Sequence, residues 1–427
     1  MAFAKRPVPP VKVYVGDNVP RHGTVPAISS GVTRGFIMNA TVIDALLTAM
    51  VQSGTGVSDL LFAVGKPPIV EDHGSLEEFP IDTPGGVLGM EQIEQIAAHL
   101  MQDNPRLVQD LAEFGSCDGS YALGEIARFR VNIFKQNGRQ AIVMRQLATK
   151  IPTLEDLSLP PIFKQIVKEK NGIILVTGAT GNGKTTTLAA MLNELNRTQP
   201  IHIVTLEDPI EFLHPHQKAL FNQRELGKDF PDFATGLRAA LRQAPKVILV
   251  GEIRDRATME IAMTASETGH IVFTTMHTIS AGQTINRILG MFAKEEEQQL
   301  RQRLADTLRY VVSQRLVNKV GGGRLLVTEI MGSSLRTRET LVYGERENSS
   351  FQEIIEAGST EGWHSFDQSL LAAYKDDLIT DETARIFCQH KNKMGRDLEM
   401  LKKLREQVFD EPSGLRMEGT ESMMEWR

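Results

Sequence analysis

The sequence predicts an α/β protein with a parallel sheet at its centre, a smaller α+β domain before it and a helical region after it. Two observations predict the sheet. Between residues 163 and 335, short apolar stretches such as IILVT and VILVG alternate with stretches of helical periodicity, and strands that are buried on both faces have this continuous apolar character. A glycine-rich turn joins the first of these strands to a helix, which is the context of a phosphate-binding loop.

The overall composition indicates a globular protein of two or three domains. The chain has 427 residues, of which 41% are hydrophobic and 23% charged, and this balance is typical of folded domains. It contains no apolar run near the roughly 18 residues that a membrane span requires. A net charge of -6 argues against a nucleic-acid partner, because such binding requires clustered positive charge. We therefore expect a cytoplasmic protein that reaches a membrane only through protein partners.

The two cysteines predict neither a disulfide framework nor a zinc site. Cys117 and Cys388 lie far apart, and no CxxC pair occurs. A tetracysteine zinc site requires four thiolates, so this usage fits a reducing cytoplasm.

The first 150 residues divide into an extension and a small domain. Residues 1–38 are rich in Pro and Gly without a helical or strand period, which predicts a flexible extension. Residues 39–150 combine a helical pattern with strand-like stretches, and Asn137-Gly138 separates two alternating runs. This dipeptide between alternating runs predicts a β-hairpin. Four arginines fall within the hairpin and, taken alone, read as solvated charges on an exposed sheet face: Arg128, Arg130, Arg139 and Arg145.

Three further segments follow the small domain. Residues 151–162 are Pro-rich and predict a linker, and residues 163–335 carry the alternating strands and helices of the core. Residues 336–410 are mostly of helical character, and residues 411–427 are polar and predicted to be disordered.

The phosphate loop is the strongest chemical signal in the chain. Residues 178–185 read GATGNGKT, which satisfies GxxxxGK[ST] between a strand and a helix. Glycines allow backbone N–H groups to wrap a phosphate, and the helix N-terminus favours negative charge. Lys184 is expected to reach the β- and γ-phosphates of ATP, and Thr185 to bind Mg²⁺. The residues expected to contact the nucleotide are Gly178, Ala179, Thr180, Gly181, Asn182, Gly183, Lys184, Thr185 and Thr186.

Two strands of the predicted core end in acidic residues. Glu252 follows VILVG, and Glu207-Asp208 follows HIVTL. Ligands of open parallel sheets gather at the carboxyl ends of the strands, so these carboxylates beside a phosphate loop indicate a hydrolytic site. Either acid alone is equally well explained as an exposed strand end.

The strings GATGNGKTTT, TLEDPIEF, LRAALRQAP, VILVGEIRD and ETGHIVFTTMHT, in this order, resemble the ordered motifs of the type II secretion and type IV pilus ATPases. The resemblance covers about residues 40 to 395 and implies a RecA-like ATPase domain behind a PAS-like N-terminal domain. It implies that Glu252 holds Mg²⁺ through water and that Glu207 activates water. It also places His270 and His277 with the nucleotide-binding residues, where His277 senses the γ-phosphate.

The compact N-terminal domain and the stretch WHSFDQSLLAAYKDDLITDETA resemble the twitching-motility (retraction) motors of the PilT and PilU type. Members of this group form hexamers in which the N-terminal domain of one subunit closes over the nucleotide of another. The resemblance therefore implies a homo-hexameric ATPase whose Arg130 and Arg145 act on the neighbouring subunit's phosphates. It also implies an inner-membrane pilus platform protein as partner, and a position at the inner face of that membrane.

The chain departs from the family pattern at several places. Ala179 and Asn182 replace the usual Pro and Ser of the loop, and neither change removes a side chain that contacts phosphate. Lys246 stands where the family commonly has Asp, and no His follows Leu60. The segment after Ile330 matches the usual retraction-motor helix poorly, which leaves the coupling to a platform open.

Several alternatives remain open from the residues. The protein could be an accessory PilU-like subunit that co-assembles with a paralogous motor, or a type II secretion or pilus-assembly ATPase on another platform. A small-molecule kinase would require a lid and an acceptor pocket, for which no segment is evident. DNA translocation conflicts with the acidic balance.

Overall fold

The computed structural model describes residues 38–147, 150–347 and 349–410. The predicted flexible extension and the predicted disordered tail lie outside these residues, apart from Met38. The described chain forms two compact units, one containing residues up to 156, 185–253 and 260–265, and the other containing residues 157–184, 254–259 and 266 onward. None of the described helices combines the length and apolar character that crossing a bilayer requires.

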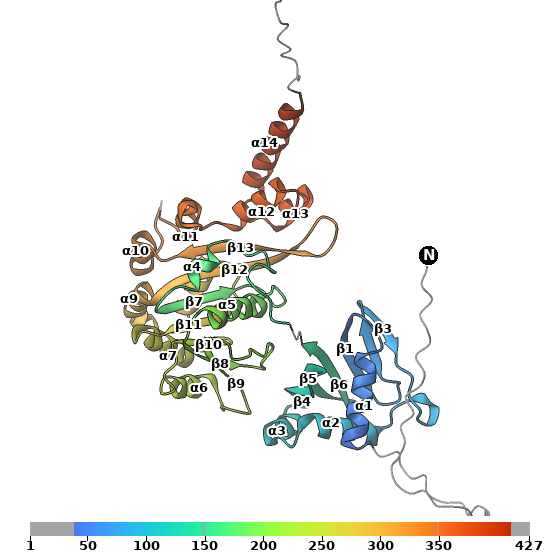
Figure 1. The fold of residues 1–427 in the computed structure, drawn as a ribbon. Coiled ribbons are helices and arrows are strands. Elements are labelled where there is room, and N and C mark those ends of the chain that lie inside the picture. The colour runs from blue at the N-terminus through green and yellow to red at the C-terminus, as the bar shows by residue number, and fades with distance from the viewer. Residues whose placement is uncertain (1–37, 148–149, 348, 411–427) are drawn as a thin grey trace, which may run out of the picture. The chain divides into compact units, whose positions relative to one another are not determined.

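The N-terminal domain is built on a six-stranded antiparallel sheet with the order β3-β2-β1-β6-β5-β4 (Figure 1). Its strands are β1 (Val57–Ala63), β2 (Ile69–Asp72), β3 (Ser75–Glu78), β4 (Ser116–Leu123), β5 (Ala127–Gln136) and β6 (Arg139–Leu147). Its helices are α1 (Ala40–Val51), α2 (Met90–Met101) and α3 (Pro105–Glu113), with a 3₁₀ turn η1 (Pro84–Gly86).

The predicted hairpin at Asn137-Gly138 is confirmed. It joins β5 to β6, and Asn137 and Gly138 have φ values of 49° and 74°. Two consecutive positive φ angles match the twist of the flanking strands, which explains the preference for this dipeptide. Along β5, Phe129, Val131 and Ile133 point into the core of the domain. The residues between them, including Arg130, therefore lie on the opposite face.

The second sheet contains seven strands in the order β13-β12-β7-β11-β10-β8-β9. The strands are β7 (Gly172–Thr177), β8 (His202–Glu207), β9 (Leu220–Glu225), β10 (Val247–Val250), β11 (Ile271–Met276), β12 (Leu308–Asn318) and β13 (Arg324–Gly332). The pairs of β7 with β11 and β12, and of β8 with β9 and β10, are parallel, whereas β12 and β13 are antiparallel. Every residue of β7, β10 and β11 is buried. The predicted parallel sheet is therefore confirmed.

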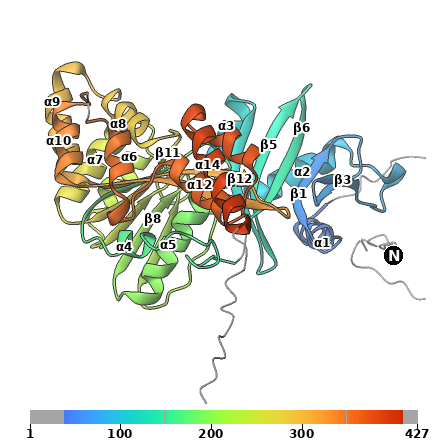
Figure 2. The same cartoon turned by 90° about the horizontal axis from the view of Figure 1, so that it is seen from above.

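Helices follow most of the core strands and then form the C-terminal region (Figure 2). They are α4 (Phe163–Ile166), α5 (Lys184–Thr198), α6 (Phe233–Ala240), α7 (Arg256–Glu267), α8 (Ala281–Leu289), α9 (Glu297–Thr307), α10 (Leu335–Tyr343), α11 (Phe351–Ala357), α12 (Phe366–Lys375), α13 (Asp381–Phe387) and α14 (Lys391–Asp410), with 3₁₀ turns η2 (Lys294–Glu296) and η3 (Ser359–Glu361). In the C-terminal region, Phe366 and Leu370 of α12 share a buried apolar cluster with Val317 and Val327 of the sheet. Burial of these side chains fixes α12 to β12 and β13.

Candidate functional site

The phosphate loop connects the end of β7 to the start of α5. Gly178, Gly181 and Gly183 have φ values of 147°, 80° and 78°, a backbone conformation that residues with a Cβ atom rarely adopt. At Gly178 a Cβ atom would also lie 2.6 Å from the backbone oxygen of Gln314. Glycine is therefore required here for both backbone shape and close packing against β12.

The ammonium group of Lys184 lies inside this loop. Its Nζ donates hydrogen bonds to the backbone oxygens of Gly178 and Ala179 at 2.8 and 3.1 Å, and the residue is only 9% exposed. A positive charge held within a glycine-rich turn at a helix N-terminus is suited to bind phosphate.

Asn182 holds the loop against the neighbouring strand. Its Nδ2 donates a hydrogen bond of 3.1 Å to the backbone oxygen of Gln314 on β12. The sequence placed Asn182 among the residues expected to contact the nucleotide and did not predict this contact with β12. The sequence could not have identified the acceptor, because every residue carries a backbone carbonyl and nothing in the sequence marks that of Gln314.

The start of α5 offers oxygen ligands for a cation. Thr185 and Thr186 are half-buried at the first turn of this helix. Within the described ranges, no group of three or more His, Cys, Asp or Glu side chains could hold a metal by itself. A lone hydroxyl group fits Mg²⁺, which usually keeps several waters and is shared with the phosphates of its substrate.

Glu207 is the last residue of β8 and is 8% exposed. Its Oε1 accepts hydrogen bonds from Thr205 Oγ1 at 2.6 Å and from Gln223 Nε2 at 3.0 Å. Burial raises the pKa of this carboxyl to about 7, and the two hydrogen bonds act in the opposite direction. A carboxylate with this pKa can accept a proton at neutral pH.

Glu252 leaves the sheet beside Glu207. It follows β10, which pairs in parallel with β8 so that Val250 lies opposite Leu206. The N–H of Gly251 donates to the oxygen of Leu206 at 2.8 Å. The structure therefore places Glu207 and Glu252 at the same edge of neighbouring strands.

The two predicted histidines lie at opposite ends of β11. This strand pairs with β7 so that Ile271 lies opposite Gly172 and Met276 opposite Thr177. His277 therefore leaves the sheet next to the phosphate loop. His270 precedes the strand, about 20 Å away along six strand residues, so the structure does not bring it to the loop of its own chain. The expectation that His270 contacts a nucleotide at the phosphate loop of its own chain is therefore corrected.

The predicted trans-acting arginines lie on the solvent-facing side of the N-terminal sheet. Arg130 and Arg145 are direct partners on β5 and β6. Arg145 Nε lies 2.9 Å from Asp59 Oδ1, and Arg130 Nη2 lies 3.9 Å from Asp118 Oδ1. The arginine side chains are 70% and 50% exposed, whereas the side chain of Asp59 is only 8% exposed. Arg145 therefore satisfies a buried carboxylate, while the exposed Arg130–Asp118 pair contributes little stability.

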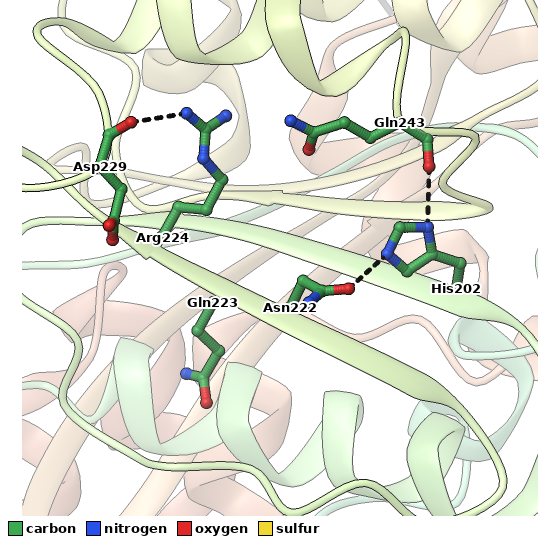
Figure 3. A pocket seen from close by; sticks show the side chains of 6 residues that line it. All are labelled: His202, Asn222, Gln223, Arg224, Asp229 and Gln243. Atoms are coloured by element: carbon green, nitrogen blue, oxygen red, sulfur yellow. Dashed lines mark hydrogen bonds between the residues drawn. The ribbon is translucent and has the colours of Figure 1, made fainter.

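A polar cavity of about 460 Å³ lies along β8 and β9. The residues that line it are His202, Asn222, Gln223, Arg224, Asp229 and Gln243 (Figure 3). His202 contacts Asn222 Oδ1 at 2.8 Å and the backbone oxygen of Gln243 at 2.9 Å. The lining runs along β8 and β9 from His202, which begins β8, to Arg224, which lies opposite Leu206, and none of the phosphate-loop residues lines this cavity.

The comparison with known proteins agrees with the motifs. Residues 121–353 match the model of the type II/IV secretion system protein family. The type IV pilus retraction ATPase PilT of Pseudomonas aeruginosa is 41% identical over 330 residues, which cover 77% of this chain and 94% of that protein. The type IV pilus ATPase PilU of the same organism is 36% identical over 363 residues, or 84% and 91% of the two chains.

Solved structures show the same fold. The crystal structure of the pilus retraction motor PilT with bound ADP has a TM-score of 0.73 at 36% identity and covers 83% of this chain and 99% of its own. The ATPase DotB of Legionella pneumophila has a TM-score of 0.72 at 26% identity, with 83% and 97% covered.

Lys184→Ala is expected to weaken binding of a fluorescent ATP analogue at least about 30-fold, because a buried charge that binds phosphate is lost. Fluorescence anisotropy with Mg²⁺ present measures this change. Lys168→Ala removes an exposed lysine and serves as the matched control. Equal affinity in the two variants would contradict the assignment of Lys184.

Proposed function

The chain belongs to the type II/IV secretion ATPase family, and from this premise we propose that it is a hexameric motor that hydrolyses ATP to power type IV pilus retraction and twitching motility. The observation that carries the catalytic part is Glu207, a buried carboxylate whose pKa of about 7 suits a base that takes a proton from the attacking water.

Two parallel strand pairs support the assignment of nucleotide-binding residues to strand ends. β7 pairs in parallel with β11, and β10 with β8, and ligands of parallel sheets bind at the carboxyl ends of the strands. We assign ATP to the loop from Gly178 to Lys184. Thr185 and, through water, Glu252 would hold Mg²⁺, which neutralises charge on the phosphates. His277, at the end of β11, would respond to the γ-phosphate.

Coverage of the relatives favours retraction over secretion or assembly. The chain covers 94% of PilT and 91% of PilU. By contrast, it covers 34% of a type II secretion system protein E from Xanthomonas campestris and 33% of the pilus assembly ATPase PilB. An accessory role beside a paralogous motor is the second candidate, because PilU matches over nearly its whole length.

The exposed side chains of Arg130 and Arg145 support the proposal that the subunits assemble into a ring. A head-to-tail ring places the same surface of each subunit against the next one, and Arg130 and Arg145 are then available to stabilise charge on a neighbour's phosphates. The proposed partner outside the ring is an inner-membrane pilus platform protein. The motor would act from the cytoplasm, at the inner face of that membrane, without nucleic acid.

Glu252→Gln is expected to retain ATP binding within about threefold and to lower kcat at least about 100-fold, because a weakened hold on Mg²⁺ costs more as charge develops during the reaction than it does in nucleotide binding. Phosphate release and anisotropy measure the two quantities. Glu295→Gln changes an exposed glutamate and is the control. Normal turnover of Glu252→Gln would remove that residue from the mechanism. Nucleotide binding without turnover by the unmodified protein would favour the accessory role.

The pH dependence tests Glu207. Its base form predominates above the pKa of about 7, so kcat/KM should rise with pH below 7 and level off above it. Thr205→Val removes a hydrogen bond that lowers this pKa, and the inflection should move to higher pH. Thr198→Val, at an exposed position on α5, should leave it in place. An inflection that does not move in Thr205→Val would show that another group titrates.

Rings assembled from two different variants test whether Arg145 acts on the nucleotide of a neighbouring subunit. Arg145→Ala and Lys184→Ala should each be inactive alone, but co-expression should restore activity to about a quarter of the wild-type value. This fraction follows because, in random 1:1 rings, about a quarter of the sites combine an intact lysine with an intact neighbouring arginine. A mixture that stays inactive would indicate that Arg145 acts within its own subunit or only supports the fold.

A further inference from the structure

A row of buried polar side chains leads away from the phosphate loop. Thr177 of β7, Ser313 of β12 and Glu329 of β13 lie opposite one another in register, and their exposures are 0%, 0% and 1%. Thr177 Oγ1 donates a hydrogen bond of 3.0 Å to Ser313 Oγ. Because Thr177 immediately precedes Gly178, one end of the row lies at the loop and the other end is a buried carboxylate.

One oxygen of Glu329 holds the start of the helix that follows His277. Its Oε1 accepts a hydrogen bond of 2.9 Å from the N–H of Ala281, the first residue of α8. Ser280 already caps this helix through the N–H of Gln283, so α8 does not require a buried carboxylate in order to begin here. The additional contact fixes the position of the backbone only four residues after His277.

The other oxygen of Glu329 contacts the C-terminal helices. Its Oε2 accepts a hydrogen bond of 3.4 Å from Gln389 Nε2, in the turn between α13 and α14. Asp367 of α12 accepts hydrogen bonds from the N–H groups of Gln389 and His390 at 2.7 and 3.0 Å. These hydrogen bonds therefore hold the turn between α13 and α14 against α12.

Arg315 provides a second attachment of the C-terminal helices to the sheet. Arg315 of β12 donates a hydrogen bond of 2.7 Å to the backbone oxygen of Phe387, and its guanidinium lies 3.9 Å from the centre of the Phe366 ring. Arg315 is two residues from Ser313, so both side chains lie on the same face of β12. The C-terminal helices are thus bound to the sheet close to the polar row.

We propose that Glu329 is a positioning residue for ATP hydrolysis, which holds the segment after His277 and links it through Gln389 to the turn between α13 and α14. The inference rests on the proposed ATPase function. A carboxylate with two donors from different elements transmits a shift of either one to the other, since losing one hydrogen bond in the interior is costly. The coupling is reciprocal: nucleotide binding changes the C-terminal helices, and a partner bound to those helices changes hydrolysis.

Gln389→Ala tests the link without touching the nucleotide residues. Amide hydrogen exchange of the full-length protein is measured with and without Mg²⁺ and AMP-PNP. In the unmodified protein, exchange over residues 381–398 should change at least about threefold when the analogue binds, and in Gln389→Ala this change should fall below about 1.5-fold. The control is Gln352→Ala, which removes another half-buried glutamine bonded to a carboxylate, Glu356, and should behave as the unmodified protein does.

Steady-state kinetics distinguish a positioning role of Glu329 from a role in folding alone. Glu329→Ala should lower kcat about tenfold while KM changes less than about threefold. Glu329→Gln should recover at least about half of kcat, because an amide oxygen still accepts from Ala281 and Gln389 can turn its own oxygen, which has no partner among the described residues, toward the new amide.

Three outcomes bear on the proposals. Failure of the unmodified protein to bind AMP-PNP overturns the proposed function and this inference together. If the unmodified protein binds AMP-PNP and amide exchange responds equally in Gln389→Ala and Gln352→Ala, the inference is overturned and the proposed function stands. Equal losses of kcat in Glu329→Ala and Glu329→Gln also overturn it, since the shape-conserving variant retains the contact with α8.

Discussion

The parallel register of β7 with β11 and β12 decides which groups surround the phosphate loop. Thr177 lies opposite Met276 on one side and Ser313 on the other, so the loop emerges beside His277 and against the carbonyl of Gln314. Side chains alternate along a strand, and a shift by one residue would turn Ser313 to the other face. The close approach of Gly178 to β12 and the buried polar row both depend on this one alignment.

Burial and hydrogen bonding act against each other at Glu207. Removal from water favours the neutral acid, whereas the hydroxyl of Thr205 and the amide of Gln223 favour the carboxylate. Their balance leaves the group able to change its charge near neutral pH. One of the two donors comes from β9, at the end of the sheet order, so an edge strand far from the phosphate-loop sequence tunes the proposed base.

The N-terminal domain and the core differ in how they use charge. In the core, ionisable side chains such as Glu329 are buried and satisfied by defined donors, which makes their position specific and their loss costly. In the N-terminal domain, the side chains of Arg130 and Arg145 are exposed; Arg130 is loosely paired with Asp118, whereas Arg145 donates to the buried Asp59. An exposed, loosely paired guanidinium such as that of Arg130 can exchange one partner for another at little cost, which suits the proposed contact with a second subunit.

Local patterns in the sequence determined the phosphate loop, the buried strands and the hairpin at Asn137-Gly138, because turn chemistry and hydrophobic periodicity act over a few neighbouring residues. They also indicated that Glu207 and Glu252 end strands. Only the tertiary structure decided what lies beside these residues. It placed His270 at the far end of β11, and brought Gln223 to Glu207 and Glu329 to the start of α8. These contacts join segments that are distant in the chain, and strand order, which no local pattern encodes, sets them.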